Sequence, residues 1–161
     1  MAVRKRRGSL LSPRRWLLLA ESLVALACAR VGLRCMQVAA LSATGCRVCA
    51  KLRIDSQQIS PQQAREAAAW VHRASRLIPG TQCLPQALAT QWLVARRGGF
   101  CTLHVGVARR DSAFRSHAWA TMGDAVLIGG GNAPRLYREI LRVEGAAPAA
   151  RPDTAPAAWS R

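Results

Sequence analysis

Residues 83–108 read CLPQALATQWLVARRGGFCTLHVGVA, and within them the hydrophobic period changes from that of a helix to that of a strand. Apolar side chains first recur at helical spacing, at Leu84, Leu88, Trp92 and Ala95. Gly98 and Gly99 end this helix after Arg96. From Phe100 to Ala108 apolar and polar residues alternate, which predicts a strand. Its apolar face is made of Cys101, Leu103, Val105 and Val107.

Downstream of this segment the sequence predicts a small antiparallel meander. Its parts are a polar connection over 109–113, a strand over 115–121, a strand over 125–129 and a closing helix over 134–141. Gly123 and Asp124 separate the last two strands and predict a two-residue hairpin turn.

Upstream, two more helices are expected. One begins at Ser60, an N-cap residue followed by proline, and ends before Pro79. The other covers residues 14–38, and residues 42–59 lack a helical period and predict a connector. The buried side of the first helix is expected to hold Leu18, Ser22, Ala25, Ala29 and Leu33. Helices followed by a small antiparallel sheet make an α+β fold.

The chain has 161 residues, enough for one domain with a modest core. We divide it into a basic N-terminal segment and helix (1–45), a functional domain (46–145) and a disordered tail rich in alanine and proline (146–161). With 24 basic and 8 acidic side chains, the net charge of +16 favours acidic partners. This composition excludes a multidomain enzyme, a multispanning membrane protein and an acidic disordered chain.

The N-terminal region has some features of a signal peptide, since basic residues precede the apolar stretch 16–29. However, Glu21 interrupts that stretch, and Arg30 and Arg34 follow it. The stretch is also shorter than the roughly 20 apolar residues that span a bilayer. We therefore expect a cytosolic amphipathic helix and a cytoplasmic protein with reduced thiols.

Six cysteines are present, and only Cys46 and Cys49 have the C-x-x-C spacing of a zinc or redox site. The sequence contains no matching second pair, so we expect no metal; we also expect no cofactor. No phosphate-binding loop of the form G-x-x-x-x-G-K-[ST] occurs. Five cysteines are expected to fill small apolar positions, namely Cys28, Cys35, Cys46, Cys49 and Cys101.

The sixth, Cys83, opens a predicted helix, where unpaired N–H groups and the helix dipole stabilise a thiolate. His117 lies in the middle of a predicted strand, where an apolar residue is the less costly choice. A helix-terminal cysteine that faces a strand histidine is the arrangement of a thiolate–imidazolium nucleophile. On these two residues alone, structural roles for both are the more common case.

Three other side chains are weighed against this site. His104 lies on the first strand and is a minor candidate for lining it. His72 is on a helix and is expected to be solvated. Trp119 shares a strand face with His117, and we expect it to pack on the helix that carries Cys83 rather than to wall a cleft.

Three blocks together resemble the lasso-peptide biosynthesis B proteins. They are CLPQALA at 83–89, LHVGV at 103–107 and FRSHAW at 114–119, and the resemblance covers residues 60–141. These proteins are transglutaminase-like (papain-like) cysteine peptidases that remove the leader from a lasso-peptide precursor. The resemblance implies that Cys83 attacks the carbonyl at the leader–core junction. It also implies that His117 holds Cys83 as a thiolate and then protonates the leaving amine.

The same resemblance implies partners. Residues 1–59 show no convincing strand pairs for the precursor-recognition domain of fused relatives, so we expect a stand-alone peptidase with a separate recognition protein. An ATP-dependent, asparagine-synthetase-like lasso cyclase is expected to capture the freed core amine. The basic surface suits an acidic leader or the recognition protein, and a solvated arginine face explains it equally well; no nucleic acid is expected.

The family's third catalytic residue is where this sequence departs from the pattern. The family places an aspartate on the strand after the His-Ala-Trp block, and that position is Gly129 here. With a two-residue turn, His117 pairs with Gly130, and Asp124 lies roughly 20 Å along the strand as a turn residue only. Asn132 or a backbone carbonyl is then left to orient the imidazole. The alternatives are a weakened enzyme or a different hairpin register.

Two non-catalytic interpretations stand beside the peptidase. One is a basic nucleic-acid-binding module, although the sequence lacks a helix-turn-helix, an aromatic RNA-binding platform and zinc-finger spacing. The other is a membrane-surface module anchored by the basic N-terminal helix.

Overall fold

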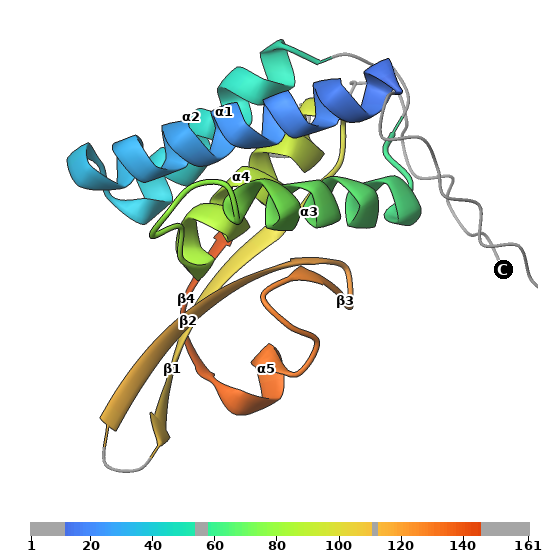
Figure 1. Cartoon of the computed structure of the whole chain (residues 1–161). Helices are drawn as coiled ribbons and strands as arrows, with labels where there is room; N and C mark the ends of the chain where they lie inside the picture. The colour runs from blue at the N-terminus through green and yellow to red at the C-terminus, as the bar shows by residue number, and fades with distance from the viewer. Residues whose placement is uncertain (1–11, 54–57, 111–112, 146–161) are drawn as a thin grey trace, which may run out of the picture.

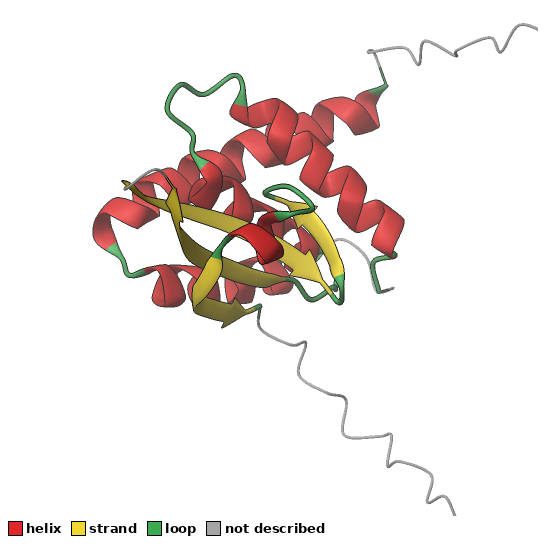
Figure 2. Cartoon of the chain, turned by 90° about the horizontal axis from the view of Figure 1, so that it is seen from below, coloured by secondary structure: helices red, strands yellow, loops and turns green. Residues whose placement is uncertain are grey.

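The computed structural model describes residues 12–53, 58–110 and 113–145. Its elements are α1 (Pro13–Cys35), α2 (Val38–Lys51), α3 (Pro61–Ser75), α4 (Cys83–Arg96), β1 (Thr102–Arg110), β2 (Ala113–Met122), β3 (Ala125–Ile128), α5 (Ala133–Leu136) and β4 (Arg138–Glu144). Helices α1 to α4 lie together on one side of the sheet and α5 lies on the other (Figure 1, Figure 2). The expected α+β fold is confirmed. The predicted tail, 146–161, lies outside the described residues.

Helix α4 is the centre of the core and has the predicted bounds. It packs against α1, α2, α3 and β2, and its residues are buried on every side from Ala87 to Ala95. The amide of the fully buried Gln91 accepts a hydrogen bond from Ser42 Oγ (2.6 Å) and donates to the carbonyl oxygens of Cys101 (2.9 Å) and Val143 (3.0 Å). The Gln91 side chain therefore connects α4 to α2, to the residue that precedes β1 and to β4.

Helix α3 begins where the sequence predicts, because Ser60 and Gln63 form a capping box. The Gln63 N–H donates to Ser60 Oγ, and the Ser60 N–H donates to Gln63 Oε1. Pro61 occupies the first helical position.

The region before α3 differs from the prediction. The expected single helix 14–38 ends at Cys35, and α2 occupies most of the expected connector 42–59. Helix α2 buries mainly small side chains, with Gly45 directly against the Trp92 ring, so it shows no run of large apolar residues at helical spacing. Position 46, our sequence-based start of the functional domain, lies within α2.

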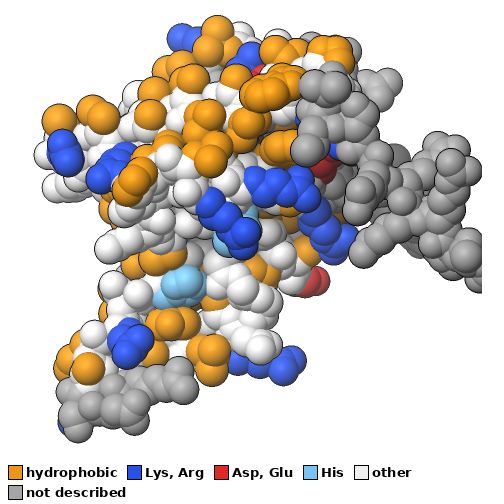
Figure 3. Space-filling model, viewed as in Figure 1, with side chains coloured by type: hydrophobic (Ala, Val, Ile, Leu, Met, Phe, Trp, Pro, Cys, Tyr) orange, Lys and Arg blue, Asp and Glu red, His pale blue; other side chains and the backbone are white. Residues whose placement is uncertain are grey.

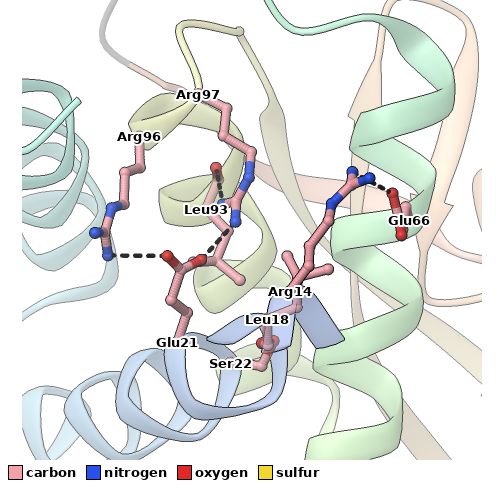
Figure 4. A network of polar contacts seen from close by, with 8 residues as sticks. All are labelled: Arg14, Leu18, Glu21, Ser22, Glu66, Leu93, Arg96 and Arg97. Atoms are coloured by element: carbon pink, nitrogen blue, oxygen red, sulfur yellow. Dashed lines mark hydrogen bonds and ion pairs between the residues drawn. The ribbon is translucent and has the colours of Figure 1, made fainter. Parts of the chain in front are cut away.

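Helix α1 buries the predicted positions Leu18, Ser22, Ala25 and Ala29, while Leu33 is partly buried. Glu21 forms ion pairs with Arg96 and Arg97 at the end of α4, as Figure 4 shows. Among the described residues, α1 is one helix that is long and apolar enough to cross a membrane by length and composition. The expectation that the apolar stretch is too short is therefore wrong. A core helix passes the same test.

The sheet has the order β3-β2-β1-β4, and all its neighbours are antiparallel. Gly123 and Asp124 form the predicted turn, since Met122 pairs with Ala125. The closing helix expected over 134–141 is wrong: α5 has a single turn, and the chain then pairs with β1 as β4. This pairing satisfies the N–H and C=O groups of β1 at what would otherwise be a free sheet edge.

Candidate active site

Cys83 is the first residue of α4, so the fold places its thiol at a helix N-terminus. The side chain of Gln82, the N-cap residue, makes no capping hydrogen bond. Pro85 has no N–H, which leaves the N–H groups of Cys83 and Leu84 as donors in the first turn. These groups favour negative charge beside the sulfur.

His117 lies on β2 and is half-buried. Its Nε2–H donates to the carbonyl oxygen of Gly129 at 2.7 Å. Because a carbonyl only accepts, this bond selects the neutral tautomer in which Nδ1 is free to take a proton. The ring also stacks on Tyr137, with the centroids 4.9 Å apart. The histidine therefore has a defined tautomer and a supported ring plane.

One cavity of about 480 Å³ brings Cys83 and His117 together. Its walls come from α3, α4, β2, β3 and the glycines after β3. The lining residues are Arg65, Ala68, Ala69, His72, Cys83, Gln86, His117, Leu127, Ile128, Gly129 and Gly130. No hydrogen bond joins the described side chains of Cys83 and His117 to each other. In free enzymes such a contact is often long until substrate binds.

The register beyond the hairpin differs from the prediction because of a bulge. Thr121 pairs with Val126 but Ala120 pairs with Ile128, so one extra residue enters β3. The expected pairing of His117 with Gly130 is therefore wrong, since the pairing of β2 with β3 ends at Ala120 and Ile128. The His117 side chain instead reaches the Gly129 carbonyl. Of the two orienting groups considered from the sequence, the backbone carbonyl makes the contact.

Gly129 itself has no room for a side chain. Its φ is +98°, a left-handed conformation that glycine adopts most readily. An added Cβ would lie 2.5 Å from Trp119 Cβ and 2.8 Å from the Ala118 carbonyl oxygen. An aspartate, the residue of the family's pattern, does not fit this backbone.

Asp124 lies in the exposed turn and is not among the residues that line the cavity, as expected. His104 does not line the cavity either. It is buried, and its ring nitrogens contact Glu139 and Thr121 Oγ1. Trp119 packs, but on a different partner from the one expected: it stacks on His104 across the strand pair, with the centroids 5.3 Å apart.

Two polar residues of the cavity, Arg65 and Gln86, were missed from the sequence, and His72 was given no role in the site. His72 is exposed, as expected, yet it faces the same cavity as Cys83. Arg65, Ala68 and His72 are spaced three and four residues apart, so they share one face of α3. That spacing was the available signal. The cavity lining carries positive charge and no carboxylate among its described residues.

The other cysteines are not among the residues that line the cavity. Burial raises the pKa of the Cys101 thiol to about 12, and desolvation also raises the pKa of Cys49. Cys46 is buried, but Cys28 and Cys35 are exposed, so the packing role expected for these two is wrong. Within the described ranges, no three His, Cys, Asp or Glu side chains are grouped to hold a metal ion.

Among known families, the model described as the transglutaminase-like superfamily matches residues 22–142, a range that includes all the residues that line the cavity. No curated protein and no solved structure matches the chain significantly.

Proposed function

We propose that this chain, which belongs to the transglutaminase-like superfamily, is a cysteine peptidase that removes the leader from a lasso-peptide precursor. The observation that carries the peptidase chemistry is the shared cavity of Cys83 and His117. The lasso substrate rests on the three sequence blocks, CLPQALA, LHVGV and FRSHAW.

In the proposed reaction, His117 Nδ1 takes the Cys83 proton and the thiolate attacks the scissile carbonyl carbon. The carbonyl oxygen becomes an oxyanion, which the N–H groups of the first turn of α4 can stabilise. The C–N bond then breaks, and Nδ1–H gives its proton to the leaving amine of the core peptide. Water hydrolyses the remaining thioester, again with the imidazole as base, and releases the leader as a carboxylate.

The Gly129 carbonyl serves as the orienting group in this scheme. It holds the tautomer and the direction of the ring, which are the main tasks of a triad acid. It carries only a partial negative charge, so it stabilises the imidazolium less than an aspartate does. We therefore expect slower turnover than in relatives that have the acid.

The cavity wall also suggests what the substrate carries. Arg65 and His72 face the same space as the nucleophile, without a carboxylate among the described lining residues. A peptide with an acidic side chain near the scissile bond complements this wall. An acidic leader is the proposed substrate for that reason.

The proposed partners are the precursor leader, a separate recognition protein that delivers it and an ATP-dependent, asparagine-synthetase-like cyclase that consumes the freed amine. We place the reaction in the cytoplasm, where the cyclase has ATP. In this proposal the cavity binds only the part of the leader next to the cleavage site, and the recognition protein binds the rest.

The test is leader release followed by mass spectrometry, with a candidate precursor and its recognition protein. Cys83→Ala and His117→Ala are each expected to lower the rate by about a thousandfold or more. Cys28→Ala is the matched control, because Cys28 is exposed and is not among the lining residues. Equal cleavage by wild type and Cys83→Ala contradicts the proposal. So does salt-sensitive binding to random DNA without any cleavage.

A further inference from the structure

Helix α1 turns an apolar face to the outside. Trp16, Leu17, Val24 and Val31 are between 58% and 65% exposed. Ala20, Ala27, Cys28 and Cys35 are exposed on the same side of the helix. In Figure 3 hydrophobic side chains accordingly cover the upper part of the molecule, where α1 lies. A surface helix ordinarily exposes polar residues there, so a contiguous apolar stripe marks an interaction surface.

The charges around this stripe are mostly basic. Arg14 is exposed at its beginning, where it pairs with Glu66 of α3, and Arg34 is exposed at its end. Helix α2, which follows α1, exposes Arg47 and Lys51. The nearest carboxylate of α1, Glu21, is largely buried and paired with Arg96 and Arg97. In sequence, Arg4, Lys5, Arg6 and Arg7 precede the helix.

We propose that the protein docks on an anionic membrane surface through the outward face of α1, with the helix lying in the interface plane. Apolar side chains flanked by arginines are the combination that binds the headgroup–acyl boundary of acidic lipids. The cytoplasmic leaflet is anionic, which agrees with a cytoplasmic protein bound to its inner face. The inference does not depend on the peptidase reaction.

The helix lies on the membrane in this proposal and does not cross it. Its opposite side, with Leu26 and Ala29, is buried in the core. Crossing would pull these residues out of the bundle and break the ion pairs of Glu21 with α4. A second copy of the chain is the weaker occupant, because two chains of net charge +16 repel each other.

The test is flotation of the full chain with anionic vesicles, made of about 30% phosphatidylglycerol in phosphatidylcholine. Neutral vesicles of phosphatidylcholine alone are the comparison. We expect binding to the anionic vesicles that weakens as salt is raised. The Leu17→Ser/Val24→Ser variant is expected to bind these vesicles at least about tenfold more weakly than wild type. The control is Leu136→Ser/Ile140→Ser, which removes two similarly exposed apolar side chains from α5 and β4 and is expected to bind as wild type does.

Circular dichroism and thermal unfolding show whether each variant folds, and light scattering reports its mass. The proposal is overturned if wild type does not float, or if the two double variants lose binding equally while folded. It is also overturned if wild type forms dimers and does not bind vesicles, while the Leu17→Ser/Val24→Ser variant is monomeric. Capture of the recognition protein by the α1 face, with no flotation, assigns the surface to a protein partner instead.

Discussion

Gly129 offers the sharpest test of how the imidazole is held. Replacing it with alanine forces a side chain into φ +98°, which costs about 1–3 kcal/mol. The new Cβ would lie 2.5 Å from Trp119 Cβ and 2.8 Å from the Ala118 carbonyl oxygen, so the chain must shift. Overpacking of this kind adds about 1–3 kcal/mol. We expect Gly129→Ala to lower the free energy of unfolding by about 4 kcal/mol.

The same shift moves the Gly129 carbonyl away from His117. A displacement of about 1 Å near reacting groups can cost about a hundredfold in rate. We therefore expect kcat/KM for leader cleavage to fall about a hundredfold in Gly129→Ala, measured at a temperature where the variant is folded. Gly129→Asp, which restores the family's residue type, is expected to be no more active, because its Cβ meets the same backbone.

Gly123→Ala is the control for backbone conformation. Gly123 also has a positive φ, of 56°, but nothing lies within 4 Å of an added Cβ. We expect it to lose about 1 kcal/mol of stability and to keep its cleavage rate. Urea unfolding and the mass-spectrometric assay measure both quantities. If folded Gly129→Ala cleaves as fast as wild type, the carbonyl does not orient His117 and this explanation of the site is refuted.

Three further outcomes concern the core. Gln91→Leu removes hydrogen bonds to Ser42 and to two buried carbonyls, and is expected to lower the free energy of unfolding by about 3–5 kcal/mol in urea titrations. An unchanged midpoint would falsify the role of Gln91. Thr90 has a buried hydroxyl without a hydrogen-bond partner in the described structure. Thr90→Val is therefore expected to add about 1 kcal/mol of stability and to raise the melting temperature. A lower melting temperature would show that the hydroxyl has a partner. Since the folded Cys101 pKa, about 12, is above its ordinary 9.0, the folded state keeps a proton that the unfolded chain releases. Stability is therefore lost between these pH values as pH rises, by about 1.4 kcal/mol per unit. Cys101→Ala is expected to show a flatter decline between pH 9 and 11, and equal slopes in the two proteins exclude this cause.

The parts of the fold with local signals could be predicted from the sequence. The Ser60 capping box, the Gly123–Asp124 turn and the whole of α4 depend on residues close together in the chain. The position of Cys83 at a helix N-terminus follows from the last of these. Such features need no knowledge of distant contacts.

The parts that were missed depend on distant contacts. Helix α2 is stabilised by packing Gly45 against Trp92, and β4 exists because β1 offers it an edge. The bulge in β3 shifts the register after the turn, and a residue count along an ideal hairpin does not contain it. The His117 side chain makes the contact with the Gly129 carbonyl, so strand pairing alone does not predict it. Arg65 was overlooked, and His72 was given no role in the site, because their relevance depends on the distance between α3 and α4.

The Gly129 carbonyl has a consequence for how the site can be lost through mutation. An orienting carboxylate is deleted by a single substitution of its side chain, whereas every residue type has a main-chain carbonyl. The contact with His117 therefore depends on the path of the chain at Gly129, and a substitution there acts through the backbone shift that it forces. Inactivating mutations in this region should cluster in the bulge and the glycines after β3, and a survey of acidic residues would overlook them.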